Sequence, residues 1–189
     1  MKNFQKLGQG MHVLPLLLAI KRRKDMWKED TYLRDFPQGP FKQIESIMLR
    51  FPPKSVHETK EALNNHLLTF DQHECIDYPA YKSLTEARPI IMNLMNFVGG
   101  ERLGRVMINK ISPGGKIFPH RDTEAHADYY SRFHVVVQSG PGANFRAGDE
   151  QINMATGETW WFDNSEEHEV INNSDDDRIH MIIDIRTSR

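Results

Sequence analysis

The stretch RFHVVVQ, residues 132–138, alternates between two kinds of side chain. Its phenylalanine and two of its valines occupy every second position, and Arg132 and His134 stand between them. Successive side chains of a β-strand point to opposite faces of the sheet. The stretch therefore predicts a strand with one apolar face and one face that presents two basic groups.

Segments with the same period of two fill the chain after Gly100, and turns rich in Gly, Pro, Asn and Asp separate them. Short strands at nearly regular spacing are typical of a double-sheet jelly roll of the cupin kind. The sequence thus predicts a mainly β fold. The expected strands are 104–111, 116–119, 132–138, 144–147, 150–154, 158–162, 167–172 and 178–185.

The first hundred residues show a different pattern, which we interpret as helices and loops. We expect an N-terminal helical layer over residues 1–100, packed on a β core over residues 101–189, with both parts in one compact domain. Helices are predicted at 13–20 and 55–69. Prolines on either side of residues 41–51 indicate an irregular segment there.

The apolar run at 13–20 is too short to span a bilayer. The basic cluster KRRK at 21–24 follows it, which is the reverse of the order in a signal peptide. Cations at the C-terminal end of a helix are stabilised by the helix dipole. We therefore expect a helix packed on the body of the protein rather than a membrane segment.

A further helix is predicted before Gly99 and Gly100, which would end it. Ser83 and Glu86 have the spacing of a capping box at its start, and Pro89 is expected in the first turn. Apolar residues recur at helical intervals between these signals.

Composition restricts the class of protein. The chain of 189 residues has 24 Lys and Arg against 26 Asp and Glu, a net charge of −2. It therefore lacks the basic field that draws proteins to nucleic acid, and we expect no nucleic-acid partner. Cys75 is the single cysteine, so no internal disulfide can form, which favours a reducing compartment such as the cytoplasm.

Two histidines differ from the other seven in their surroundings. His120 and Asp122 follow a predicted strand at positions i and i+2, so both side chains can converge on one point, and His168 comes from a second strand region. Two imidazoles and one carboxylate on one face of an octahedron suit a non-haem Fe(II) enzyme, because three positions stay open. Taken alone, this pattern also occurs by chance.

Two arginines share strand faces with histidines. Arg178 and His180 alternate with apolar residues in the last strand, as Arg132 and His134 do in theirs. An arginine that faces the inside of a small barrel is costly unless it meets an anion, and its planar fork fits a carboxylate. Two such arginines beside a metal suggest a dicarboxylate site. The alternative is a salt bridge from either arginine to rim acids: Asp149, Glu150, Asp175, Asp176 or Asp177.

From about Gly104 to Arg186 the chain resembles the aspartyl/asparaginyl β-hydroxylase family of Fe(II)- and 2-oxoglutarate-dependent oxygenases, whose fold is a double-stranded β-helix. The stretches that carry the resemblance are Pro119-His120, Arg132-Phe133-His134, Gly157-Glu158-Thr159-Trp160-Trp161-Phe162-Asp163, and His168-Glu169-Val170 with Arg178 ten positions on. The combination is specific, whereas each piece alone is not.

The resemblance implies a role for each matching residue. His120 and His168 would bind iron, and Arg178 would hold the distal carboxylate of 2-oxoglutarate. Arg132 and His134 would assist near the other end of this cosubstrate. Asn109 stands where the family places a small hydroxyl residue that helps to bind it.

Asp122 departs from part of the family pattern. The animal aspartyl hydroxylases have glycine at this place, whereas bacterial free-proline hydroxylases that resemble the family keep the aspartate. We expect Asp122 to be the third metal ligand, and the alternative is an acceptor for a metal-bound water. Between this residue and Arg132, the segment with Arg121, His126, Tyr129 and Tyr130 is interpreted as a solvated loop.

These observations predict a dioxygenase that hydroxylates an amino-acid substrate with dioxygen, Fe(II) and 2-oxoglutarate. The substrate is an aspartyl or asparaginyl residue in a peptide or protein, or a free amino acid such as proline. The alternative is a cupin-type module that binds a metal and a carboxylate ligand without turnover. Such a module is expected to lack the arginine or an iron ligand, and this sequence keeps both.

Overall fold

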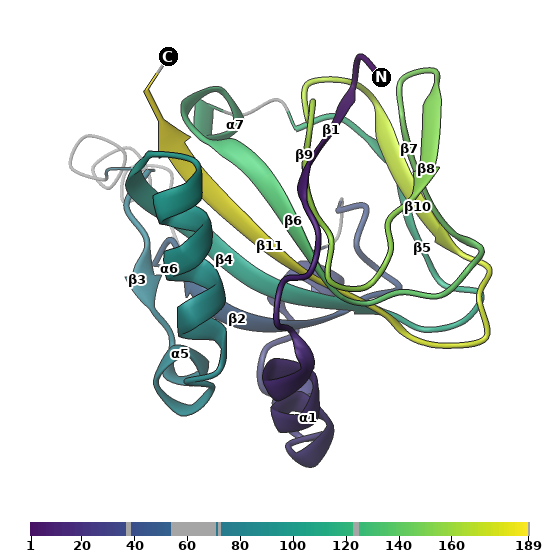
Figure 1. The fold of residues 1–189 in the computed structure, drawn as a ribbon. Coiled ribbons are helices and arrows are strands. Elements are labelled where there is room, and N and C mark those ends of the chain that lie inside the picture. Colours follow the sequence, from purple (N-terminus) through teal and green to yellow (C-terminus); the bar gives the residue numbers. More distant parts are fainter. Residues whose placement is uncertain (37–38, 54–70, 72, 123–124, 189) are drawn as a thin grey trace, which may run out of the picture.

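Two antiparallel β-sheets stacked face to face form the body of the protein, with helices on one side (Figure 1). The computed structural model describes all residues except 37–38, 54–70, 72, 123–124 and 189. The predicted helix at 55–69 lies outside the described residues. The larger of the two sheets has seven strands. In spatial order they are β1 (Phe4–Gly8), β9 (Thr159–Phe162), β6 (Ser131–Gln138), β11 (Arg178–Thr187), β4 (Gly100–Ile111), β2 (Glu45–Phe51) and β3 (Ile76–Asp77).

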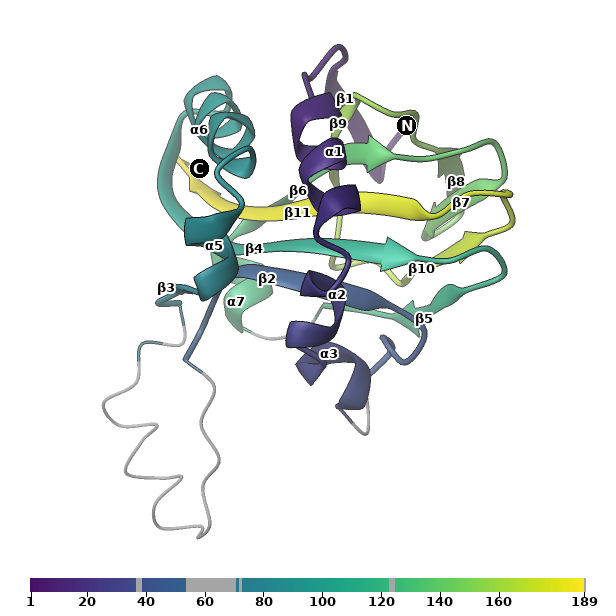
Figure 2. The same cartoon turned by 90° about the horizontal axis from the view of Figure 1, so that it is seen from below.

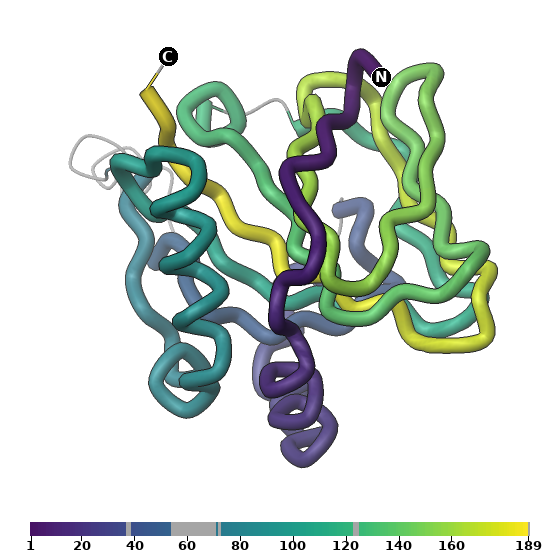
Figure 3. Tube along the Cα trace, viewed as in Figure 1, coloured from purple at the N-terminus to yellow at the C-terminus, as the bar shows by residue number. Residues whose placement is uncertain are grey.

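The small sheet has the order β5 (Lys116–His120), β10 (His168–Asn172), β7 (Ala143–Ala147) and β8 (Glu150–Asn153). Successive strands of the second half of the chain pass back and forth between the two sheets, as the trace shows (Figure 3). This is the predicted jelly roll, and all eight strands expected after Gly100 are confirmed, with ends that differ by a few residues.

The prediction of an irregular segment at 41–51 is wrong. Residues Glu45–Phe51 form β2, which pairs with β4 inside the large sheet. Both faces of this strand are covered, because Ile47 and Leu49 pack under the helices while Met48 packs toward the other sheet. A strand buried on both faces lacks the alternation that marks a half-exposed one. Together with β1 and β3, it brings the first hundred residues into the sheet, where we had expected only helices and loops.

Helices cover the outer face of the large sheet (Figure 2). The predicted helix near 13–20 is confirmed as α1 (Leu14–Arg22), with Lys21 and Arg22 in its last turn. Its buried residues pack on the apolar side of β6. The alternation of RFHVVVQ therefore directs Phe133, Val135 and Val137 outward to the helices. The same layer contains α2 (Met26–Glu29), α5 (Pro79–Ser83) and α6 (Ala87–Phe97), whereas α3 (Tyr32–Asp35) and α7 (Ala125–Tyr129) contact the inner side of the large sheet.

The predicted capping box of α6 is wrong. This helix begins at Ala87, and Glu86 at its N-cap makes no side-chain capping hydrogen bond. Ser83 instead ends α5, where its hydroxyl donates to the carbonyl of Ala80. Pro89 lies in the first turn of α6 as expected. None of the helices in the described part of the chain has the length and apolar character that a bilayer crossing requires. The cytoplasmic location stays a prediction.

A second core fills the space between the two sheets. Phe145 and Val170 from the small sheet pack there against Val136, Trp160 and Phe162 from the large one. Trp160 faces this interior and Trp161 packs toward the helices, because neighbouring side chains of a strand point to opposite faces. Toward one end, polar side chains replace the apolar ones, and a cleft opens between the sheets.

Candidate metal centre and carboxylate pocket

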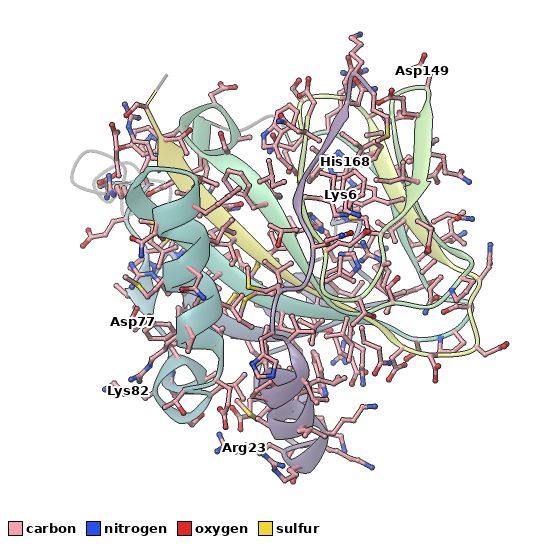
Figure 4. The ribbon with its side chains drawn as sticks, in the orientation of Figure 1. Lys6, Arg23, Asp77, Lys82, Asp149 and His168 are labelled. Atoms are coloured by element: carbon pink, nitrogen blue, oxygen red, sulfur yellow. The ribbon has the colours of Figure 1, made fainter. Side chains whose placement is uncertain are left out.

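His120 and His168 face each other across neighbouring strands of the small sheet. His120 ends β5, His168 begins β10, and the two residues are direct partners in the antiparallel register. Their ring centroids are 4.2 Å apart, and Figure 4 shows His168 inside the sandwich. Asp122 follows two residues after His120, and one potential ligand atom from each of the three residues lies within 4.8 Å of the other two. The predicted convergence is therefore present.

Backbone carbonyls fix the orientation of both imidazoles. The Nδ1 atom of His120 donates to the carbonyl of Phe118 at 2.8 Å, and Nδ1 of His168 donates to that of Glu166 at 2.9 Å. Each ring therefore keeps Nε2 as the atom with a free lone pair. Burial lowers the pKa of His120, and it lowers the pKa of His168 to about 4 with help from the charge of His120. Both rings are thus neutral near pH 7, as metal ligands must be.

Asp122 presents one carboxylate oxygen to the imidazoles and the other to hydrogen-bond donors. Its Oδ1 lies 3.8 Å from Nε2 of His120. Its Oδ2 accepts from the Arg132 guanidinium at 2.6 Å and from the Asn164 amide at 3.2 Å. Burial alone would raise the pKa of Asp122, but the positive charge of Arg132, the two histidines and the hydrogen bond from Asn164 together outweigh it and lower the pKa. The group is an anion with one oxygen directed to the histidines.

Sequence reasoning did not identify Asp184 and His126, which lie behind this centre. Arg132 forms a bidentate pair with Asp184, in which Nε and NH2 donate to its two oxygens at 2.8 and 2.9 Å. Nε2 of His126 donates to the same carboxylate at 2.9 Å. Asp184 lies on the same face of β11 as Arg178 and His180, because side chains two positions apart in a strand point the same way. The period of two that identified Arg178 and His180 could therefore also have identified Asp184.

The segment that contains α7 is not a solvated loop in its described part, so that interpretation is wrong. His126 and Tyr130 are both buried. The ring of His126 points into the fold because Asp184 holds it, and the hydroxyl of Tyr130 donates to the carbonyl of His73 at 2.7 Å.

Arg178 lies deeper between the sheets and is almost fully buried, with 2% of its surface exposed. NH2 of its guanidinium donates to Nδ1 of His180 at 3.1 Å, and the group stands 5.7 Å from the ring centroid of Phe145. Among the described residues, Arg178 takes part in no salt bridge, so the alternative of a pair with a rim acid is not seen. Burial lowers its pKa to about 9.

His180 adds a second buried donor beside this guanidinium. A guanidinium can only donate, so Nδ1 of His180 is an acceptor, and it also accepts from Nδ1 of His134 at 3.2 Å. The proton of the neutral His180 ring is therefore on Nε2, which is buried and has no hydrogen-bond partner within the described part of the chain. Nearby on β4, Asn109 accepts from the hydroxyl of Ser46 at 2.8 Å.

All of the predicted site residues except Arg178 line one cleft with about 640 Å³ of empty space, its open mouth included. The three candidate ligands line it together with Asn109, Arg132 and His134, whereas Arg178 is not a lining residue and contacts the ring of Phe145, which is one. The complete lining is Leu33, Phe41, Phe51, Arg105, Met107, Asn109, Ile117, His120, Asp122, Arg132, His134, Phe145, Phe162, His168, Val170 and Ile182.

These donors fit a divalent iron ion and a dicarboxylic acid. Two neutral imidazoles and one carboxylate without a thiolate are the donor set of non-haem Fe(II) sites that leave positions open for other ligands. Buried cations and buried N–H groups without an acceptor are costly. Arg178 is such a cation and Nε2 of His180 is such a donor in the described structure, and acidic ligand groups are the natural partners of both.

Comparison with known proteins supports this chemistry. A family model described as aspartyl/asparaginyl beta-hydroxylase matches residues 59–188. No curated protein sequence matches the chain significantly.

Solved structures show the same fold. AviO1 from Streptomyces viridochromogenes matches with a TM-score of 0.56 at 12% identity, over 98% of this chain and 90% of that one. A Pseudomonas putida prolyl-4-hydroxylase gives 0.52 at 15% identity, over 100% and 95%. The viral collagen prolyl hydroxylase of Paramecium Bursaria Chlorella virus-1, in its 2OG complex, gives 0.52 at 10% identity, over 99% and 97%.

Proposed function

The chain belongs to the aspartyl/asparaginyl β-hydroxylase family of Fe(II)- and 2-oxoglutarate-dependent dioxygenases, and from this premise we propose how its residues divide the work. His120, Asp122 and His168 hold the iron. Arg178 binds one carboxylate of 2-oxoglutarate, and His134 and Asn109 contact the rest of this cosubstrate. The observation that carries the proposal is the set of three donors within 4.8 Å, in which both histidines have Nε2 free.

When bound, iron and 2-oxoglutarate would supply an oxidation that consumes dioxygen and the keto acid and forms succinate and carbon dioxide. In this reaction a C–H group of the substrate becomes C–OH. The side chains of this protein orient the reactants and exclude water. Phe145 and Phe162 wall the cleft beside the histidines, so water is displaced from the inner end. Backbone carbonyls keep the imidazole protons on Nδ1.

For the substrate we propose an amino acid, either free or as an exposed aspartyl or asparaginyl residue of a peptide. The outer part of the cleft supports this class. Its wall combines apolar side chains, Met107 and Ile182, with the guanidinium of Arg105, which lies 4.9 Å from the ring centroid of Phe51. Such a wall suits a small molecule with an aliphatic part and a carboxylate. We also propose that the chain is one domain, because the large sheet takes strands from both sides of residue 100.

Anaerobic addition of Fe(II) and then 2-oxoglutarate to the apo-protein tests the assignment. We expect a weak visible charge-transfer band of a chelated keto acid, and a rise in thermal stability. The His168→Ala variant is the control and should lose both signals. A colourless wild-type mixture without stabilisation would contradict the proposal and favour the non-catalytic binding module. A screen for succinate release over free amino acids and peptides then identifies the substrate.

A further inference from the structure

Arg132 connects the candidate metal ligand Asp122 to a second carboxylate. Asp184 and Arg132 are direct partners across β11 and β6, and two guanidinium nitrogens donate to the two oxygens of Asp184. The third nitrogen, NH1, donates to Oδ2 of Asp122 at 2.6 Å. One planar group thus joins two acids that are 62 residues apart in the sequence (184 − 122).

Asp184 is a rigid support for this group. Only 1% of its surface is exposed, and His126 donates a further hydrogen bond to it from the α7 side. Burial alone would raise the pKa of Asp184, but the charge and hydrogen bonds of Arg132 together with those of His126 outweigh it and hold the pKa far below its usual range. A buried charged pair with bidentate geometry has a fixed orientation, because the fork of the guanidinium matches the carboxylate.

Asp122 itself has no such support from its own element. It follows the end of β5, outside regular structure, where the side chain of an aspartate can occupy several rotamers. Arg132 and Asn164 both bind Oδ2, and this leaves Oδ1 as the oxygen near Nε2 of His120. The orientation of the candidate ligand therefore depends on where the guanidinium of Arg132 is held.

We propose that Asp184 is a positioning residue of the metal centre, which acts through Arg132 to hold Asp122 with one oxygen toward the two histidines. This inference rests on the proposed function, because it takes Asp122 as a metal ligand. It also changes the expected role of Arg132. The resemblance implied contact with 2-oxoglutarate, whereas here all three nitrogens of its guanidinium donate to protein carboxylates.

The test measures metal affinity rather than turnover. Co(II) is titrated into the apo-protein, and binding is followed by the visible d–d absorption of the ion. Asp184→Asn keeps the shape of the side chain and removes its charge. We expect Co(II) to bind about 10- to 100-fold more weakly, the range for loss of a group that orients a ligand. An unchanged affinity would overturn the inference.

A matched control separates positioning from a general loss of stability. Leu16 on α1 is fully buried on the outer face of the large sheet, away from the cleft. Leu16→Ala should lower thermal stability while Co(II) affinity stays within twofold of wild type. If it weakens Co(II) binding as much as Asp184→Asn does, the effect of Asp184 is merely structural and the inference fails.

A double-mutant cycle tests whether Asp184 acts through Asp122. In an Asp122→Gly background, Asp184→Asn should change Co(II) affinity by less than twofold, because the group it orients is gone. Full additivity would overturn the inference. If Asp122→Gly alone leaves Co(II) affinity unchanged, Asp122 is not a ligand and the inference fails, whereas a metal site made of the two histidines remains.

Arg132→Lys provides a second route if Asp184→Asn does not fold. A lysine keeps the positive charge but cannot bind two carboxylates in fork geometry. Co(II) affinity should again fall about tenfold or more in wild type and by less than twofold in the Asp122→Gly background. Equal effects in the two backgrounds would contradict the inference.

Discussion

Two arginines on neighbouring strands face the same interior, yet their surroundings are opposite. Arg132 on β6 contacts two carboxylates, whereas Arg178 on β11 contacts an imidazole and the face of a phenylalanine. Burial alone would lower the pKa of either group, but Asp122 and Asp184 raise that of Arg132, while the pKa of Arg178 falls to about 9. The comparison teaches that the fold itself neutralises one cation, whereas the other has no carboxylate beside it among the described residues.

Replacing each arginine by methionine should separate the two roles most strongly. Arg132→Met leaves Asp184 charged and buried without its partner, which typically costs about 3–5 kcal/mol of unfolding free energy. Arg178→Met removes a buried charge that lacks a carboxylate among the described residues, so stability should stay within about 1 kcal/mol or increase. Urea denaturation of both apo-proteins measures the difference. Equal losses would show that the two arginines have equivalent surroundings.

The next largest effect is expected on the affinity for the cosubstrate, and here Arg178 rather than Arg132 should be the more sensitive position. Arg178→Met removes a charge-assisted hydrogen bond of about 1.5–3 kcal/mol, equivalent to roughly 10- to 150-fold weaker binding of 2-oxoglutarate. Calorimetric titration of the Co(II)-loaded protein checks this, since no turnover occurs. Succinate, which keeps one carboxylate end of the cosubstrate, serves as a competing probe. Undiminished 2-oxoglutarate affinity in the variant would remove Arg178 from the site.

The buried charge of Arg178 should also make the stability of the protein depend on pH, through His134 and His180 beside it. Burial first, and then the charge of Arg178, lower the pKa of both rings well below 6.5. The unfolded chain takes up protons below about pH 6.5 and the folded chain does not, so stability is complete above this pH and falls as pH drops. The loss is at most about 1.4 kcal/mol per pH unit for each histidine.

Arg178→Met should reduce this slope, because one cause of the lowered pKa values is removed. Denaturation of wild type and variant at pH 7.5 and pH 5.5 provides the measurement. A slope that is the same in both proteins would contradict this prediction and show that burial alone keeps the two rings neutral down to pH 5.5.

The smallest effect is expected at Ser46, at the side of the cleft. Its hydroxyl donates to Asn109, and both residues are buried. Ser46→Ala should cost about 0.5–1.5 kcal/mol of stability and leave the Arg132 end of the cleft unaffected. Denaturation reports the first part, and Co(II) affinity within twofold of wild type reports the second. A large loss of Co(II) affinity would indicate that the two ends of the cleft are coupled.

The strands of the second half could be predicted because each has one apolar face and one mixed face, so alternation is visible in the sequence. The strand at Glu45–Phe51 was missed because the prolines before and after it indicated an irregular segment, although none of them lies within the strand. The start of α6 was misplaced because a capping-box spacing does not require that a helix begin there.

At the site, spacing identified groups near in sequence but not the contacts between distant ones. His120 and Asp122 were found because a strand end places i and i+2 on one face. The pair of Arg132 with Asp184 depends on the register of two strands that are 52 residues apart (184 − 132). No local pattern fixes that register, so only the structure shows that Arg132 contacts both Asp184 and Asp122.

The placement of His120 and His168 has a consequence for the dynamics of the small sheet. β5 is an edge strand, hydrogen-bonded only to β10 within that sheet, and these two residues are cross-strand partners. An ion shared by both rings would link β5 to β10 through two side chains, so occupancy should slow amide hydrogen exchange along Lys116–His120 more than along β8 at the opposite border.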